Sequence, residues 1–263
     1  MHAFKYHRPS NVNDASSLAK GDARLLAGGQ SLVQAMKLRL SSPTDLIDLG
    51  TIKDLAGIKA SGTEVTVGAM TRHAEVAHSA EVKKAIPALA AVAGMIGDRQ
   101  VRAMGTIGGS LANNDPAADY PAAVLGLGAT ITTNKRKIAA DDFFKGLYET
   151  ALQPGEVITS VSFPVPRRAA YMKFKNQASR FAIVGVFVAD SAGGTRVAVT
   201  GAGPCVFRQK DMEKALAAKF DPASVAGVKQ KADGLNSDLH ASAEYRAHLV
   251  TVMAKRAVEA AVK

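Results

Sequence analysis

A chain of 263 residues that is 47% apolar and 21% charged has the composition of a globular protein with one large or two modest domains. Its net charge of +10 is scattered and only 5% of residues are aromatic, with no tryptophan, which argues against nucleic acid as the partner. A single cysteine, Cys205, excludes an internal disulfide and an iron–sulfur cluster held by this chain alone. No apolar run reaches the roughly 18 residues of a membrane span. The first residues lack the apolar stretch of a secretion signal, so we expect a cytoplasmic protein.

The first part of the chain predicts a small β/α unit. A short apolar strand over residues 24–27 ends in two glycines, and apolar residues at helical spacing predict a helix over residues 32–40. A second strand is predicted over residues 45–49. Beyond it, alternation predicts a strand over residues 64–68, and an alanine-rich stretch predicts a helix over residues 82–95.

Longer strands dominate the second half of the sequence. A helix over residues 120–127 and a strand over 129–133 precede predicted strands at 157–164, 171–175, 181–189 and 196–200. Helical patterns return at 211–219 and within 241–263. The change in composition near residue 170 predicts an α+β protein with a first domain at 1–170, divided into subdomains of about 1–54 and 55–170, and a second at 171–263.

The usual signatures of catalysis are missing. There is no phosphate-binding loop of the G-x-x-x-x-G-K-[ST] type, no G-x-G-x-x-G after a strand and no H-E-x-x-H motif. The six histidines are scattered, and no nucleophile elbow is present. We therefore predict neither catalytic residues nor a metal site in this chain.

Two glycine-rich segments are candidates for binding a phosphate group. The first, residues 26–32, lies between a predicted strand and a predicted helix, and the second, residues 105–110, contains Gly108-Gly109. Paired glycines allow the backbone to turn sharply and to approach a ligand, and N–H groups at a helix start favour an anion. A Gly-Gly turn before a helix also occurs without any ligand.

Two carboxylates follow the second segment. Asp115 and Pro116 have the N-cap and N1 pattern of a helix start, a role that does not exclude contact with a ligand. Asp119 falls after that first turn, where no cap is needed. Its carboxylate could accept hydrogen bonds from ribose hydroxyls, or bind Mg²⁺ together with Asp115.

Together, the two segments resemble the FAD-binding loops of the flavoprotein subunit of molybdenum hydroxylases, the family of aerobic carbon monoxide dehydrogenase and xanthine dehydrogenase. The resemblance covers nearly the whole chain, because further motifs recur in order at residues 36–39, 67–71, 100–102, 143–146, 150–156 and 243–246.

This resemblance implies a fold and a cofactor. The expected fold is an FAD-binding domain of two α/β subdomains, like that of vanillyl-alcohol oxidase, followed by a C-terminal domain of antiparallel sheet and helices. Backbone amides of the first loop, and those near Thr106 and Gly108-Gly109, would hold the pyrophosphate. The resemblance implies contacts with FAD at Leu26, Ala27, Gly28, Gly29, Gln30, Ser31, Leu32, Thr106, Gly108, Gly109, Asn113, Asp119, Ile158, Lys173 and Phe181.

Some of these assignments come with alternatives. Lys173 corresponds to a family lysine near the flavin, although Lys175 offers a second register. Phe181 falls where the carbon monoxide enzyme has a tyrosine beside the flavin ring, but it would equally suit the core of a strand. Ile158 would contact the adenine side of FAD.

The resemblance also implies a role within a complex. Electrons would pass from a molybdenum-cofactor subunit through iron–sulfur clusters on a small subunit to this FAD and on to an external acceptor, in a dimer of heterotrimers. Two other readings stay open at this point: a stand-alone FAD-dependent oxidoreductase of the same fold, and a scaffold subunit without flavin.

Overall fold

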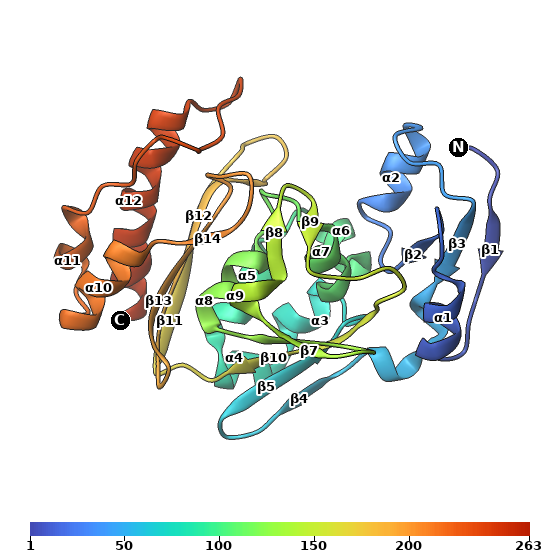
Figure 1. Cartoon of the computed structure of the whole chain (residues 1–263). Coiled ribbons are helices and arrows are strands. Elements are labelled where there is room, and N and C mark those ends of the chain that lie inside the picture. Colours follow the sequence, from blue (N-terminus) through green and yellow to red (C-terminus); the bar gives the residue numbers. More distant parts are fainter.

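The computed structural model describes residues 1–263 and places three units side by side (Figure 1). The N-terminal unit, drawn in blue, lies at one end of the molecule, and the C-terminal sheet with its helices lies at the other. Helices and a five-stranded sheet fill the space between them. The α+β fold expected from the sequence is confirmed.

The N-terminal unit is a three-stranded parallel sheet of order β1-β3-β2. The β-turn-α-β pattern expected from the sequence is present, although the helix after the glycines ends at Lys37 rather than at residue 40. The elements are β1 (Lys5–His7), α1 (Val12–Leu18), β2 (Arg24–Leu26), α2 (Leu32–Lys37), β3 (Asp45–Asp48) and the 3₁₀ turns η1 (Leu49–Thr51) and η2 (Lys53–Leu55).

The middle unit begins with a hairpin and a run of short helices. Its helices are α3 (His73–His78), α4 (Ala80–Ala85), α5 (Pro87–Met95), α6 (Arg99–Met104), α7 (Ile107–Asn113), α8 (Tyr120–Leu127) and α9 (Ala140–Phe143). Its strands are β4 (Ile58–Ala60), β5 (Glu64–Gly68), β6 (Thr130–Thr133), β7 (Lys137–Ala139), β8 (Phe144–Gly146), β9 (Glu149–Thr150) and β10 (Ile158–Pro164). Five of these strands form an antiparallel sheet of order β4-β5-β10-β6-β7, while β8 and β9 form a hairpin.

Two expectations for the middle unit were wrong. The single helix expected over residues 82–95 is two helices that break at Ile86, because Pro87 disfavours a helical residue before it and starts α5 instead. Asp115 does not cap a helix, because α8 begins only at Tyr120. The Asp115 side chain instead accepts a hydrogen bond from the N–H of Ala117 and closes a turn.

The C-terminal unit is a four-stranded antiparallel sheet of order β11-β12-β13-β14. Strand β12 is buried on both faces, which explains the long apolar run in its sequence. Val184, Val186 and Val188 pack with the helices of the C-terminal unit, whereas Phe187 belongs to the core of the middle unit. The elements are β11 (Arg168–Lys175), β12 (Ala182–Ser191), β13 (Gly194–Thr200), β14 (Phe207–Arg208), α10 (Lys210–Ala218), α11 (Pro222–Ala226) and α12 (Ala243–Ala261).

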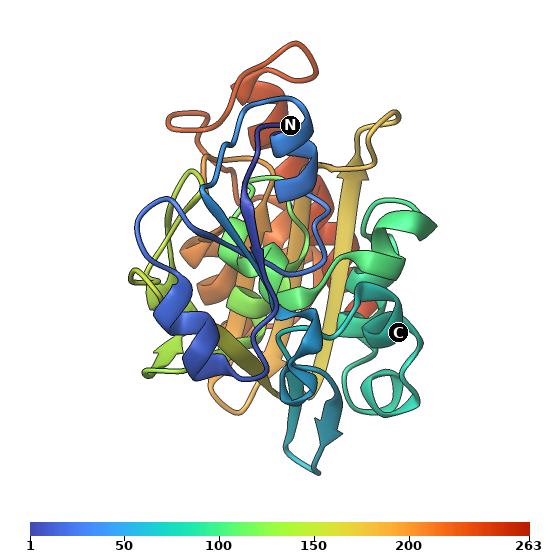
Figure 2. The same cartoon turned by 90° about the vertical axis from the view of Figure 1, so that its right-hand side faces the viewer.

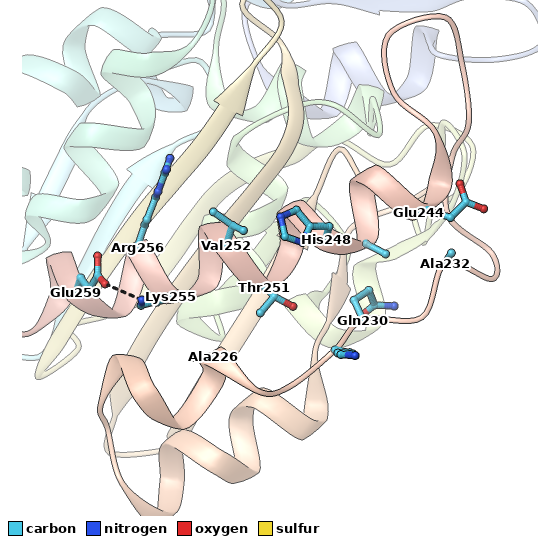
Figure 3. Close-up of a pocket in the computed structure, with 12 residues that line it drawn as sticks. Ala226, Gln230, Ala232, Glu244, His248, Thr251, Val252, Lys255, Arg256 and Glu259 are labelled. Atoms are coloured by element: carbon cyan, nitrogen blue, oxygen red, sulfur yellow. Dashed lines mark ion pairs between the residues drawn. The ribbon is translucent and has the colours of Figure 1, made fainter.

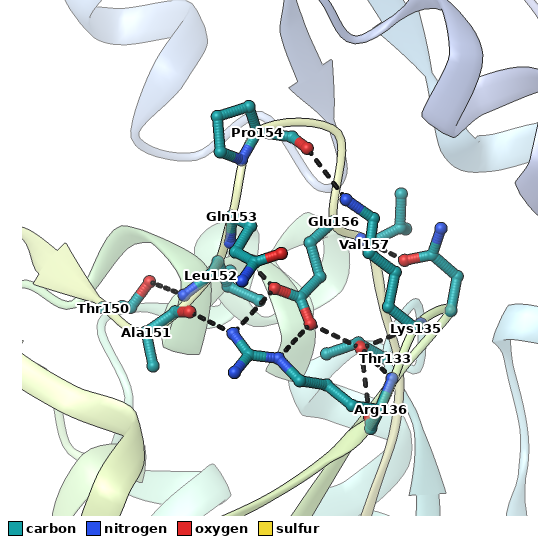
Figure 4. A network of polar contacts seen from close by, with 11 residues as sticks. Thr133, Lys135, Arg136, Thr150, Ala151, Leu152, Gln153, Pro154, Glu156 and Val157 are labelled. Carbon is teal, nitrogen blue, oxygen red and sulfur yellow. Dashed lines mark hydrogen bonds and ion pairs between the residues drawn. The ribbon is translucent and has the colours of Figure 1, made fainter.

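A polar network fixes the turn at residues 153–156 of the middle unit (Figure 4). The buried carboxylate of Glu156 accepts hydrogen bonds from the Arg136 guanidinium at 3.0 and 3.1 Å and from the Thr133 hydroxyl at 2.8 Å. Arg136 lowers the pKa of Glu156 to about 2. The turn fixed in this way presents the carbonyl of Gly155 to the Ser16 hydroxyl on α1 at 2.6 Å. The network therefore sets where the small parallel sheet docks.

Candidate functional site

The two glycine segments meet in the structure. A Cβ atom on Gly28 would overlap the carbonyl oxygen of Met104 and lie 2.7 Å from the Cα of Gly105, so only glycine fits there. A Cβ atom on Gly109 would lie 3.3 Å from the side chain of Ala27. Segments separated by about eighty residues in the sequence are thus in direct contact, one at the start of α2 and the other at the start of α7.

The first glycine segment leaves its backbone donors free. The N–H groups of Gly28, Gly29, Gln30 and Ser31 have no acceptor within the protein, and Ser31 makes no side-chain cap to α2. Gly29 has a φ of +73°, which turns the chain sharply before the helix. A run of unpaired N–H groups in such a turn is an anion-binding nest, so this segment fits the phosphates of a dinucleotide cofactor.

The second glycine segment is different, because its amides are already used. Gly108 donates to the carbonyl of Ala69 at 2.8 Å, and Gly109 donates to the side-chain hydroxyl of Thr106 at 3.2 Å. Both amides thus already have partners in the chain, and their expected contact with the pyrophosphate stays a prediction. The glycines here allow close packing, since a Cβ on Gly108 would lie 2.6 Å from the side chain of Ala69. The hydroxyl of Ser110 makes no hydrogen bond within the protein and stays available to a ligand.

Asp119 is buried and has two partners inside the protein. Its Oδ1 accepts a hydrogen bond of 2.5 Å from the Tyr171 hydroxyl, and its Oδ2 accepts one of 2.9 Å from the Lys173 ammonium. Burial raises the pKa of the Asp119 carboxyl, and Lys173 and Tyr171 oppose this shift. With a cation at one oxygen and a hydroxyl at the other, the carboxylate is not set up as a metal ligand. No group of three or more histidine, cysteine or acidic side chains in the chain could hold a metal ion.

The lysine expected near the flavin lies on the same polar cluster. Lys173 is on β11, and its Nζ donates to the carbonyl of Met95 at 2.9 Å as well as to Asp119. Its side chain is 3% exposed, whereas Lys175 faces solvent. Of the two lysines considered for the flavin contact, Lys173 is therefore the buried one.

His73 lies directly behind the junction of the two glycine segments. A Cβ on Gly105 would lie 2.5 Å from its Nε2, and its ring centroid is 5.3 Å from that of Tyr120. The Nδ1 of His73 and the hydroxyl of Tyr120 are both buried without a hydrogen-bond partner. Burial, helped by the charge of Arg102, lowers the pKa of His73 to about 4, so the imidazole is neutral near pH 7.

Three other sequence-predicted residues, Asn113, Ile158 and Phe181, lie in separate segments of the chain. Asn113 ends α7, which starts at the second glycine segment, and its side chain makes no internal hydrogen bond. Ile158 is buried at the start of β10, which packs against α7. Phe181 is 49% exposed in the connection between β11 and β12, so it is not a core residue.

Sequence reasoning missed Met104, His73 and Tyr171. Met104 contributes a backbone carbonyl, for which the residue type carries no signal. His73 and Tyr171 come from distant elements and reach the site only through the packing of α3 and β11. Of the residues at this contact, only Gly105 could have been found from the sequence, because it is part of a glycine-rich run.

A concave feature lies away from this junction. A groove of about 720 Å³ runs along α11 and α12 and is lined by Lys229, His248, Lys255 and Arg256 among others (Figure 3). None of the sequence-predicted site residues lines it. No helix of the structure has the length and apolar content needed to cross a membrane.

Comparison with known proteins gives a consistent result. Residues 2–166 match the model of the FAD binding domain in molybdopterin dehydrogenase, and residues 169–261 match that of the CO dehydrogenase flavoprotein C-terminal domain. The chain is 36% identical to the carbon monoxide dehydrogenase medium chain of Afipia carboxidovorans, over 98% of this chain and 96% of the relative. It is 35% identical to the nicotine 6-hydroxylase medium subunit of Paenarthrobacter nicotinovorans, over 97% of this chain and 96% of the relative.

Solved structures agree with these matches. Carbon monoxide dehydrogenase from Hydrogenophaga pseudoflava superposes with a TM-score of 0.90 at 36% identity, covering 98% of this chain and 97% of that chain. Quinoline 2-oxidoreductase from Pseudomonas putida 86 superposes with a TM-score of 0.89 at 30% identity, covering 99% and 97%.

The fold and the matched domains define a flavoprotein that binds FAD. The chain belongs to the family of FAD-binding medium subunits of molybdenum hydroxylases. It is accordingly an oxidoreductase subunit, and the resemblance noted in the sequence is confirmed.

Proposed function

We propose that this chain receives electrons from iron–sulfur clusters on a partner subunit and passes them, through bound FAD, to an external acceptor. The observation that supports this role is the run of free N–H groups at Gly28–Ser31, which lies in contact with the second glycine segment. The chain itself has no group of side chains that could hold a metal ion. FAD supplies the redox chemistry when it is bound, and the chain supplies its position and surroundings.

The residues of the junction divide this task. The amides of Gly28, Gly29, Gln30 and Ser31 donate to the pyrophosphate, and Gly108 and Gly109 let the second segment approach. The apolar residues on either side of these amides are Leu26, Ala27 and Leu32. The hydroxyls of Thr106 and Ser110 and the side chain of Asn113 bind polar groups of the cofactor, as does Asp119, held by Tyr171 and Lys173. Ile158 and Phe181 contact the adenine and flavin ends.

We further propose the setting of this subunit. The relatives are named as medium chains or subunits of larger enzymes, which supports assembly with further subunits. In this proposal the further subunits are an iron–sulfur subunit and a molybdenum-cofactor subunit, and the complex is a cytoplasmic dimer of heterotrimers. The domain boundary proposed at residue 170 falls inside β11, close to the gap between the two matched segments.

Reconstitution tests the relay. The complex is assembled with each subunit omitted in turn, and the FAD content and the rate of FAD reduction by the enzyme's substrate are measured. We expect about one FAD per chain in every preparation that contains this subunit, and FAD reduction only when all three subunits are present. Rapid reduction of FAD by substrate in this chain alone would instead support a stand-alone flavoenzyme.

A matched pair of glycine variants tests the site in the same experiment. Gly28→Ala forces the first segment away from Met104, so the folded variant should lose most of its FAD. Gly62→Ala, at a glycine with open space around it, should keep the full amount. Equal FAD content in the two variants would remove the first segment from the binding site.

A further inference from the structure

Three surface loops hold a bulky residue in the left-handed backbone region. Arg39 has a φ of 61°, Tyr148 of 56° and Arg180 of 63°. Such values are unfavourable for residues with a Cβ atom, and glycine is the usual choice. The fourth non-glycine case, Asn114, is of a type that tolerates this region, and it ends α7. The other three positions therefore keep a strained side chain where glycine would be easier.

Each strained residue stands beside exposed apolar side chains. Leu38 and Leu40, which flank Arg39, are 70% and 79% exposed. Leu147 and Tyr148 are each 58% exposed, and Phe181, next to Arg180, is 49% exposed. Both the strain and the exposure are unfavourable for the isolated chain, and both point to a functional surface.

The three loops lie at the same end of the molecule. One follows α2, the second is the tip of the β8–β9 hairpin, and the third connects β11 to β12; Figure 1 shows all three in the upper half of the molecule, below the loop that precedes α12. Figure 2 shows the first and the third in the upper half as well. We call residues 38–40, 147–148 and 180–181 the tip surface. In Figure 1 the three tips lie above α7, at whose start the second glycine segment meets the first.

The charge of the tip surface is one-sided. The tip surface itself contains two cations, Arg39 and Arg180, and no anion. Three lysines lie in the adjoining elements: Lys37 in α2, Lys145 in β8 and Lys175 in β11. The anions beside it include Glu149 in β9 and Asp115, which accepts a hydrogen bond from Tyr148. None of the five cations forms an ion pair within the chain. Two copies of this surface would repel each other, whereas a partner with an apolar centre and an acidic rim would complement it.

We propose that the tip surface is the docking site for the electron-donating partner protein, which presents an apolar patch rimmed by acidic side chains. This inference rests on the proposed function, since that function requires a partner to come close to the bound cofactor. Leu38, Leu40 and Leu147 are exposed beside the strained backbone, and the Tyr148 hydroxyl donates to Asp115 at 3.3 Å, which fixes its ring. The binding surface is therefore formed before the encounter.

The test uses the purified iron–sulfur subunit as the probe. Its affinity for this chain loaded with FAD is measured by calorimetry for Leu40→Ser, Tyr148→Ser and the double variant. We expect each single change to weaken binding at least tenfold and the double change at least a hundredfold, while FAD content stays near one per chain. Leu18→Ser, at an exposed leucine on α1 outside the tip surface, is the matched control and should bind normally.

A glycine variant separates docking from folding. Arg39→Gly relieves the strained backbone, so its melting temperature should stay equal or rise, yet its affinity for the iron–sulfur subunit should fall and become less sensitive to salt. Two results would overturn the inference. Unchanged affinity in the serine variants would show that docking occurs elsewhere, and loss of FAD in place of partner binding would show that the tips clamp the cofactor. Failure of the unmodified complex to reduce FAD would instead refute the proposed relay.

Discussion

At the scale of single residues, His73 is a buried imidazole with no group nearby to compensate a positive charge. Its Nδ1 has no hydrogen-bond partner, its ring packs on Tyr120, and Arg102 adds further repulsion. Its Nε2 lies behind Gly105, which in turn supports the contact between Met104 and Gly28. The protonation state of one side chain is thus linked to the junction of the two glycine segments.

This link predicts a pH dependence of stability. The pKa of His73 falls from 6.5 to about 4 on folding, so the unfolded chain binds more protons between these values. The free energy of unfolding should be fully retained above pH 6.5 and should decrease by up to about 3 kcal/mol as the pH falls to 4. Denaturant titrations of the FAD-free protein across this range measure the effect.

Two substitutions identify the source. His73→Gln should flatten the decrease between pH 6.5 and 4, because the buried group no longer titrates. His78→Gln, at an exposed histidine on the same helix, should leave it in place. An equal decrease in His73→Gln and in the unmodified protein would assign the pH dependence to other groups.

Some residues of the candidate site could be predicted from the sequence better than others. Glycines that permit close contacts, such as Gly28 and Gly108, stand out because a paired glycine before a helix is a local pattern. Whether their amides are free is not local, since Gly108 donates to Ala69 on a distant segment. The burial of Asp119 likewise depends on Tyr171 and Lys173, which only the packing of β11 brings near.

At the scale of elements, the turn at residues 153–156 acts as a connector between units. Glu156 is held by Arg136, by Thr133 and by the N–H of Gln153 at 2.8 Å. The same turn receives the Ser16 hydroxyl from α1. Because α1 and α2 belong to the same N-terminal unit, this connector also determines where the first glycine segment lies.

Neutralising the carboxylate should loosen the connector. Glu156→Gln removes charge-assisted hydrogen bonds and should lower the free energy of unfolding by about 2 kcal/mol. The amide of Gln153 should then exchange faster with solvent in hydrogen-exchange measurements. Glu81→Gln, at an exposed position on α4, should change neither quantity, and a similar loss in both variants would count against the connector.

Element lengths decided what could be predicted from the sequence. Longer strands such as β10 and β12, and helices such as α8 and α12, repeat their apolar pattern often enough to be recognised. Strands of two or three residues, such as β8 and β9, contain too little sequence for a period and are defined by their partners. The break at Pro87 was readable in principle, because proline marks a helix start.

At the scale of the whole molecule, Asp119, Tyr171 and Lys173 join the two matched segments. Asp119 precedes α8, whereas its two partners lie on β11. The apolar core of 33 buried residues also crosses this boundary, since it includes Tyr171, Phe187 and Ala198. The composition change near residue 170 indicated the new sheet, but it gave no sign that the two parts share a core.

Removing the buried cation should therefore destabilise the whole fold. Lys173→Met leaves Asp119 buried without its ion pair and should cost about 3 kcal/mol in the free energy of unfolding of the FAD-free protein. Adding Asp119→Asn should recover at least half of this loss, because no buried charge remains. Lys175→Met, at the exposed lysine on the same strand, should be nearly neutral. Equal losses at the two lysines would contradict the role given to the pair.

The shared core also has a consequence for how the two parts of the chain evolve. Matched segments that meet near residue 167 invite the idea of two modules that genes could exchange freely. Phe187 on β12 packs so tightly on Gly126 of α8 that a Cβ there would lie 2.6 Å from its ring. A hybrid chain with the two parts taken from different relatives would have to preserve this contact. It would also have to preserve the hydrogen bonds from Tyr171 and Lys173 to Asp119. We therefore expect the two parts to be inherited together, and substitutions on one side of the contact to be compensated by substitutions on the other.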